Sequence, residues 1–218
     1  MKRLKYILSS CCMLCLLISC DTKQDVLNTG VANPYFDGTI MDYLKSNDKN
    51  WDLTVQMIEH ADLVELFEGR VDTCLEITFF APPAYSILRF MLESQEKAVP
   101  GNIYEKVTDI PEALCREYIL KHVVKGKYLK EDIAYINKDF LISDEGQDGG
   151  TLLTCLGGNV LRAYLQRSSW AGVPDAGPVS MGLYSVTSGN AIPLATPDIQ
   201  PTNGVVHALN YGYDFGKI

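Results

Sequence analysis

Residues 202–209 read TNGVVHAL, and this stretch indicates how the chain folds near its C-terminal end. Asn203 and Gly204 are residue types that tight turns favour, and two valines follow them directly. His207 then stands in a segment with apolar residues on both of its alternating faces, which is typical of a strand that is covered on both sides. We therefore interpret the stretch as a turn leading into a core strand, in which a neutral imidazole donates one hydrogen bond and accepts another.

A catalytic or metal-binding histidine is the alternative interpretation of His207. A Ser or Cys nucleophile needs a histidine with an orienting carboxylate, and the sequence contains no G-x-S-x-G, H-E-x-x-H or P-loop motif. The other two histidines, His60 and His122, are scattered along the chain, which disfavours a zinc site. Residues 144–150, DEGQDGG, carry carboxylates without the ligand spacing of an EF-hand. We expect no catalytic residues, no metal and no cofactor.

The composition sets the broad class. The chain has 218 residues, of which 47% are hydrophobic and 21% are charged, and this is ordinary for one globular domain. Its formal net charge is -8. Because binding to nucleic acid needs clustered Lys and Arg, an acidic chain of this kind is not expected to bind nucleic acid.

The N-terminal segment predicts export and a lipid anchor. Three basic residues precede a short apolar stretch that ends in LISC, residues 17–20. This ending resembles the bacterial lipobox, which implies a signal peptide over residues 1–19 and a lipid on Cys20; an ordinary secretory signal is the alternative. Residues 20–38 are polar and read as a flexible tether, and residues 39–218 as the folded domain.

Three further cysteines fall within the expected domain. Cys74, Cys115 and Cys155 are an odd number, so at most one disulfide can form among them. The part after residue 20 also has no C-x-x-C pair. We expect all three to be small buried apolar residues, with one disulfide as the open alternative.

The order of the remaining patterns predicts an α+β fold. Apolar residues at helical spacing predict one helix over residues 52–68, started by Asp52 and ended by Gly69, and another over residues 111–125, ended by Gly126. Residues 76–81 read as a strand, and the part after residue 150 reads as a run of short antiparallel strands with a hairpin around Gly157 and Gly158. Helices followed by antiparallel strands form an α+β domain.

Four segments in order resemble the fasciclin-like (FAS1) domain. They are residues 39–69, like the opening helices of the family; TFFAPPAYSI, residues 78–87, like its first box; residues 114–133, like its central helix; and residues 198–209, like its second box. The resemblance implies a wedge of N-terminal helices packed on an antiparallel β-sandwich. The resemblance also gives a structural role to the residues that match the family motifs. These are Thr78, Phe80, Ala81, Pro82, His122, Asn203, Gly204 and His207.

The sequence also departs from the family pattern. Pro83 stands where the first box usually has Ser or Thr, and Lys121 stands where a Tyr-His pair is typical. Residues 141–182 do not align and read as an inserted loop or hairpin. Trp170 in this insertion, with Tyr164 and Tyr184 nearby in sequence, is our candidate ligand contact, since loop aromatics serve recognition. The alternative is that Trp170 packs onto the domain as a lid.

Together these features predict a lipid-anchored, non-catalytic binding or adhesion module of the bacterial cell envelope. A protein or a glycan is the expected partner, and the outer membrane of a Gram-negative bacterium, on its surface or periplasmic face, is the expected location. The alternative is an envelope hydrolase acting on a polysaccharide or another envelope polymer.

Overall fold

The structure is a computed structural model that describes residues 33–218, and residues 34–218 form one compact unit. The signal peptide, Cys20 and residues 20–32 of the expected tether lie outside the described residues. The α-helices are α2 (Ile40–Lys45), α3 (Asp48–His60), α4 (Val64–Phe67), α5 (Ala84–Lys97) and α6 (Glu112–Leu120). The strands are β1 (Ile77–Ala81), β2 (Val123–Lys125), β3 (Thr151–Thr154), β4 (Val160–Arg167), β5 (Val179–Ser185), β6 (Asn190–Ile192), β7 (Leu194–Ile199) and β8 (Gly204–Leu209).

The first sheet has the strand order β2-β1-β8-β7. β1 pairs antiparallel with β2 and parallel with β8, while β7 pairs antiparallel with β8. All residues of the two central strands β1 and β8 are buried. This confirms the prediction that the strand within TNGVVHAL is covered on both faces.

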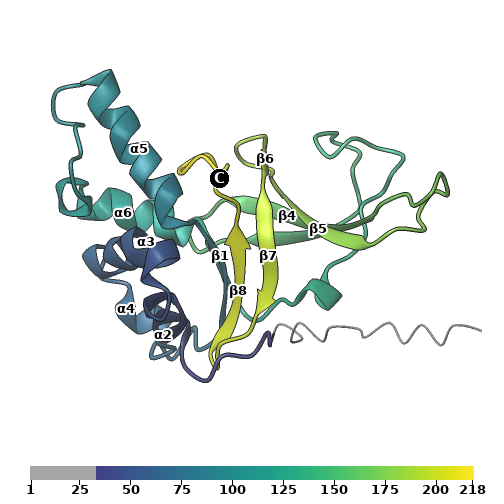
Figure 1. The fold of residues 1–218 in the computed structure, drawn as a ribbon, viewed down its shortest axis with the longest axis horizontal. Helices are drawn as coiled ribbons and strands as arrows, with labels where there is room; N and C mark the ends of the chain where they lie inside the picture. Colours follow the sequence, from purple (N-terminus) through teal and green to yellow (C-terminus); the bar gives the residue numbers. More distant parts are fainter. Residues whose placement is uncertain (1–32) are drawn as a thin grey trace, which may run out of the picture. The chain divides into compact units, whose positions relative to one another are not determined.

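The second sheet has the order β3-β4-β5-β6 and is antiparallel throughout. The β3–β4 hairpin predicted around Gly157 and Gly158 is confirmed. Only Pro193 separates β6 from β7, so the chain passes there from the second sheet directly into the first. In Figure 1 the helices lie on one side of β1 and β8, and β4 and β5 run away from the other side. The predicted α+β class, with helices and two largely antiparallel sheets, is confirmed.

The helices begin and end for identifiable local reasons. The hydroxyl of Thr39 accepts a hydrogen bond from the backbone N–H of Asp42, and the Asp42 carboxylate accepts one from the backbone N–H of Thr39. This capping box satisfies backbone donors that the first turn of α2 leaves unpaired. The single helix predicted over residues 52–68 is instead two helices, because Asp62 takes a left-handed backbone (φ 53°) that stops the helical ladder. The predicted start at Asp52 is wrong as well, since α3 begins at Asp48. Arg116 caps this break by donating to the carbonyls of Ala61 and Asp62.

The helix predicted over residues 111–125 is also shorter than expected. It ends at Leu120, and residues 123–125 form β2 against β1. The β-branched pair Val123–Val124 is better suited to a pleated strand than to a helix, and the partner strand supplies its hydrogen bonds. Gly126 therefore follows a strand instead of ending a helix, and its N–H donates to the carbonyl of Glu76.

One hydrophobic core joins the helices to both sheets. Cys74, Cys115 and Cys155 are buried in it with free thiols, as predicted from the sequence. Burial raises the pKa of the Cys115 thiol to about 11 and that of Cys155 to about 12, so both stay protonated at neutral pH. Within residues 33–218, no helix is both long and apolar enough to cross a membrane.

Two segment boundaries differ from those read off the sequence. Backbone pairing begins before Thr39, because Phe36 donates to the carbonyl of Gln200 and Gln200 donates to that of Pro34. Residues 141–182 supply β3, β4 and the start of β5 to the second sheet, and residues 141–150, 155–159 and 168–178 connect these strands.

Candidate functional site

His207 is a fully buried structural residue at the centre of the first sheet. Its Nδ1 accepts a hydrogen bond from the backbone N–H of Asp198 at 3.2 Å, so Nε2 carries the ring proton and donates to the carbonyl of Tyr128 at 2.9 Å. Phe80 stacks on the ring with a centroid distance of 5.3 Å. Burial lowers the pKa of His207 and keeps the imidazole neutral. One donated and one accepted bond are what the sequence predicted.

His122 is buried in the same way but uses the opposite tautomer. Its Nδ1 donates to the carbonyl of Tyr118 at 2.7 Å, and its Nε2 accepts from the hydroxyl of Tyr213 at 2.9 Å. Burial lowers its pKa to about 4. Since both histidines are enclosed and fully bonded, neither is placed to act on a ligand.

The other motif residues tie loops to the first sheet. Thr78 donates through its hydroxyl to the carbonyl of Gly126 and accepts from the N–H of Tyr128. Asn203 accepts from the N–H of Ile40 at 2.7 Å and donates to the carbonyl of Phe67 at 3.0 Å, which fixes α2 and α4 on the turn before β8.

The remaining members of the motif set are packed just as closely. A Cβ on Gly204, whose φ is 153°, would overlap the carbonyl of Ile77. Ala81 is buried against Ala208, and the carbonyl of Pro82 accepts from the hydroxyl of Thr54. The motif set therefore builds the fold.

A ligand site is better supported on the outer face of the second sheet. Along β4, Leu161, Ala163 and Leu165 are buried, so the alternating residues Tyr164 and Gln166 point to the opposite face. Two hollows of about 580 Å³ each lie on this face, and Tyr164 and Gln166 line both. We call the two hollows together the outer trough.

The first hollow of the outer trough lies between two loops. Its lining is mixed polar and apolar: Ile136, Asn137, Lys138, Phe140, Leu141, Ile142, Tyr164, Gln166, Arg167, Ser168, Ser169, Pro174 and Asp175. Lys138 on one loop forms an ion pair with Asp175 on the other, and so links the two walls. Arg167 donates one guanidinium N–H to the carbonyl of Gly177 and forms no ion pair with the described residues. Within residues 33–218 its other N–H groups have no acceptor, so they can donate to a ligand.

The second hollow is set by a glycine opposite Tyr164. Tyr164 and Gly182 face each other in the β4–β5 register, and a Cβ on Gly182 would overlap the Tyr164 ring. The ring therefore lies across the neighbouring strand in the space that a side chain would otherwise fill. Partial burial raises the pKa of Tyr164, so the phenol stays protonated. The other lining residues are Gln166, Ser180, Met181, Leu183, Ala191, Ile192, Pro193, Leu194 and Gly212.

Of the three aromatic residues predicted as ligand contacts, one lines the outer trough. Tyr164 lies at the centre of the outer trough, whereas Trp170 and Tyr184 line neither hollow. Trp170 is 69% exposed, so the lid alternative is wrong. It lies on the loop whose neighbouring residues Ser168, Ser169 and Pro174 form the rim of the first hollow.

Sequence reasoning missed most of the lining. Asn137, Lys138 and Phe140 come from a loop that no motif marked, and Gln166 and Arg167 were not singled out. The period-two alternation of β4 carried a usable signal, since it places Tyr164 and Gln166 on one face.

The acidic turn 144–150 has a structural role. The Asp144 carboxylate accepts from the N–H of Leu141, and that of Asp148 accepts from the side-chain amide of Asn137. Among residues 33–218, no group of three His, Cys, Asp or Glu side chains is arranged to hold a metal ion.

Comparison with known proteins gives a likeness of fold alone. No family model matches the sequence, and no curated protein matches it. Among solved structures, a FAS1 domain pair from the insect cell adhesion molecule fasciclin I is similar, with a TM-score of 0.43 and 10% sequence identity. The match covers 81% of this chain and 46% of the insect chain, so this chain spans about half the length of that structure.

Proposed function

We propose that this chain is a binding module that recognises a glycan in the outer trough and does not cleave it. The observation that carries the proposal is the position of Tyr164, an aromatic ring laid across Gly182 between two hollows. Sugar rings present C–H faces that pack on aromatic rings, and hydroxyls that need several polar partners. The amides of Asn137 and Gln166, the guanidinium of Arg167 and the hydroxyl of Ser168 supply such partners along the trough.

The charged residues of the outer trough favour binding over hydrolysis. Most glycoside hydrolases use two carboxylates on either side of the scissile bond. Asp175 is the one carboxylate in the lining of the two hollows, and it is paired with Lys138. The hydrolase alternative would therefore need a second acid from outside the trough.

The cellular setting is part of the same proposal and rests on the sequence. A lipid on Cys20 would hold the domain at the bacterial cell envelope, on the outer membrane, with the outer trough free to meet a glycan. The insect structure comes from a cell adhesion molecule. A binding role agrees with that description, but the proposal rests on the trough of this chain.

A protein partner is the second candidate, and the exposed apolar residues on the rim favour it. Leu141 is 71% exposed and Trp170 69%, and both stand on loops beside the first hollow. Exposed apolar side chains beside a hollow are the kind of residue that a protein partner covers.

The test is an array of envelope glycans and envelope proteins probed with the full-length chain and with two variants. If a glycan binds in the trough, Tyr164→Ala lowers its affinity about tenfold or more, as expected for losing one stacked ring together with its shape complementarity. Tyr85→Ala, which removes an exposed tyrosine from α5, is the matched control and leaves glycan binding unchanged. A protein hit that is lost in Trp170→Ala but kept in Tyr164→Ala would favour the second candidate. Cleavage of a bound glycan, seen by mass spectrometry, would contradict the non-catalytic role.

A further inference from the structure

The exposed face of α5 carries a stripe of large apolar side chains. Its members Tyr85, Leu88 and Leu92 are 40 to 54% exposed. Their spacing of three and four residues places them within about 60° of one another around the helix. In Figure 1 the second half of α5 projects beyond the other helices. None of the three residues lines the outer trough, so the stripe is a separate surface.

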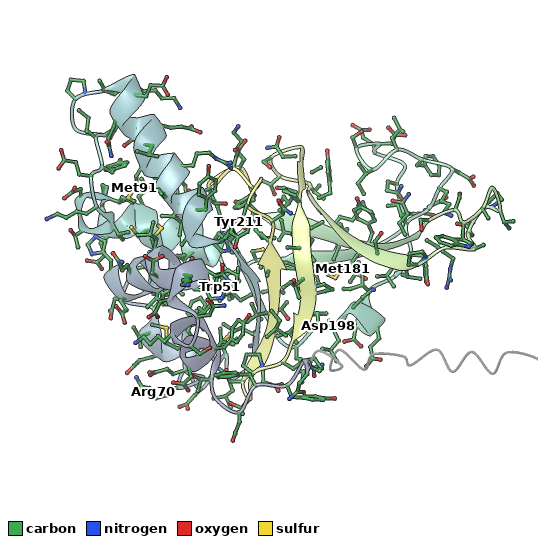
Figure 2. All side chains as sticks on the ribbon, viewed as in Figure 1. Trp51, Arg70, Met91, Met181, Asp198 and Tyr211 are labelled. Carbon is green, nitrogen blue, oxygen red and sulfur yellow. The ribbon has the colours of Figure 1, made fainter. Side chains whose placement is uncertain are left out.

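Exposed apolar residues at both ends of the helix lengthen the stripe. Tyr211, labelled in Figure 2, follows β8, and its ring meets that of Tyr85 edge-on at 6.3 Å between centroids. Val99, just past the end of α5, is exposed as well. The result is an apolar surface of the kind that another protein covers. Apolar residues three and four apart are the pattern with which one helix packs lengthwise against another, so the stripe fits a helix.

Arg89 and Glu96 flank the stripe on one side and carry opposite charges. Each lies four residues beyond a member of the stripe and therefore beside it on the helix surface. Glu96 forms no ion pair within residues 33–218. Arg89 forms one with Asp214, but Lys217 pairs with the same carboxylate, so this group of side chains keeps a net positive charge. The flank thus has an excess positive charge near the start of α5 and an excess negative charge near its end.

A second copy of α5 running in the opposite direction matches this arrangement. When two identical helices pack antiparallel, the same flank of each helix meets, and a twofold axis makes the contact self-complementary. With the axis beside Leu92, Arg89 of each copy lies level with Glu96 of the other. A parallel pair would instead bring this flank against the opposite flank of the partner, where Ala84 and Met91 are buried in their own domain.

We propose that α5 is a self-association surface, on which a second copy of this chain packs its own α5 antiparallel about a twofold axis beside Leu92. The apolar stripe supplies the contact area. The two Arg89–Glu96 pairs select the orientation, because solvent-exposed ion pairs add little affinity of their own but disfavour the wrong alignment.

Cysteine cross-linking in membranes from cells that express the full-length chain tests the contact. Leu92→Cys lies at the axis, so it faces its own copy and should form an interchain disulfide on oxidation. Tyr85→Cys should not link to itself, because antiparallel packing sets the two copies of residue 85 about 20 Å apart along the helix. Leu152→Cys, on β3, is the matched control, since Leu152 is 57% exposed and Leu92 is 53% exposed.

We expect the yield of disulfide-linked dimer from Leu92→Cys to exceed that from Leu152→Cys several-fold. The unchanged chain gives the background, which the burial of the three cysteines among residues 33–218 keeps low. Adding Glu96→Lys places a lysine opposite Arg89 and should lower the yield about threefold. Glu145→Lys makes the same change of charge on the acidic turn 144–150 and should leave the yield unchanged.

Three results would overturn the proposal. The first is a yield from Leu92→Cys no higher than that from Leu152→Cys. The second is self-linking of Tyr85→Cys as readily as of Leu92→Cys, which would indicate parallel or unordered contact. The third is mass spectrometry that finds Leu92→Cys linked to a different protein. An unchanged yield on adding Glu96→Lys would refute the antiparallel ion pairs.

Discussion

The backbone N–H of Asp198 donates to Nδ1 of His207 at 3.2 Å, and this one contact fixes the tautomer of the buried imidazole. With Nδ1 occupied as an acceptor, Nε2 carries the proton and donates to the carbonyl of Tyr128. The histidine thus joins β7 to the segment that follows β2, across the buried strand β8. The contact also explains why Asp198 holds a left-handed backbone (φ 63°), since that turn of the chain aims its N–H at the ring.

His207→Ala should destabilise the fold by roughly 1 to 3 kcal/mol, because it leaves the Asp198 N–H and the Tyr128 carbonyl without partners. Urea denaturation of the wild type and the variant measures the difference. His60→Ala is the control and should cost less, because His60 is only partly buried and makes one hydrogen bond, to the carbonyl of Ile110. Equal losses in the two variants would contradict the central role of His207.

Acid should weaken the fold through His122. Burial lowers its pKa in the folded state from 6.5 to about 4, so between these values the unfolded chain binds the proton more readily. The stability that the neutral histidine contributes is present above pH 6.5 and is lost as the pH falls towards 4. Urea midpoints measured from pH 7 to pH 4 should fall for the wild type and fall less steeply for His122→Gln, which does not titrate. Parallel pH profiles would rule out His122 as the group responsible.

Asp198 should tolerate Asn but not Ala. Its left-handed backbone is accessible to Asp and Asn, and its carboxylate accepts from the N–H of Lys130 at 2.7 Å. Asp198→Ala should cost about 1 to 2 kcal/mol in unfolding free energy, whereas Asp198→Asn should stay within about 0.5 kcal/mol. Thermal melts of both proteins decide this. Equal melting temperatures in the two variants would show that neither the left-handed backbone nor the hydrogen bond from Lys130 contributes to stability.

Gly182→Val should abolish the proposed glycan site without touching its polar lining. The new side chain would occupy the place of the Tyr164 ring, so the ring must leave the centre of the outer trough. We expect at least about a tenfold loss of glycan affinity by calorimetry, similar to that of Tyr164→Ala. Tyr164→Phe is the matched control, since it retains the ring and should retain most of the affinity. Undiminished binding in Gly182→Val would mean that Tyr164 is not the platform.

Cys20→Ala should leave the chain without lipid and release it from the membrane fraction. LISC at residues 17–20 is the one lipid-attachment signal in the sequence, and it lies outside the described residues. Labelling of growing cells with a palmitate analogue measures the modification. Cys15→Ala is the control. Cys15 lies five residues before Cys20 in the same apolar stretch, and this variant should remain labelled. Label retained in Cys20→Ala would disprove the assignment.

Local sequence patterns predicted much of the fold. The order of helices and strands, the β3–β4 hairpin and the two-sided burial of β8 follow from periodicity and turn chemistry, which act over a few neighbours. The same patterns misplaced the break at Asp62 and the change from α6 to β2, because a helical stripe of apolar residues continues through both. At those points a contact from elsewhere in the chain decides the backbone, through Arg116 in the first case and β1 in the second.

By itself the sequence determined that His122 and His207 are core residues, that the cysteines are buried, and that the chain is α+β. The tertiary structure alone decided which atoms these histidines bond, that β1 and β8 run parallel, and that Tyr164 lies over Gly182 between two distant loops. The physical reason is that alternation along a strand reports which face is buried but not which strand lies beside it. Pairing between strands fixes the partner, and with it the register that brings Tyr164 to Gly182.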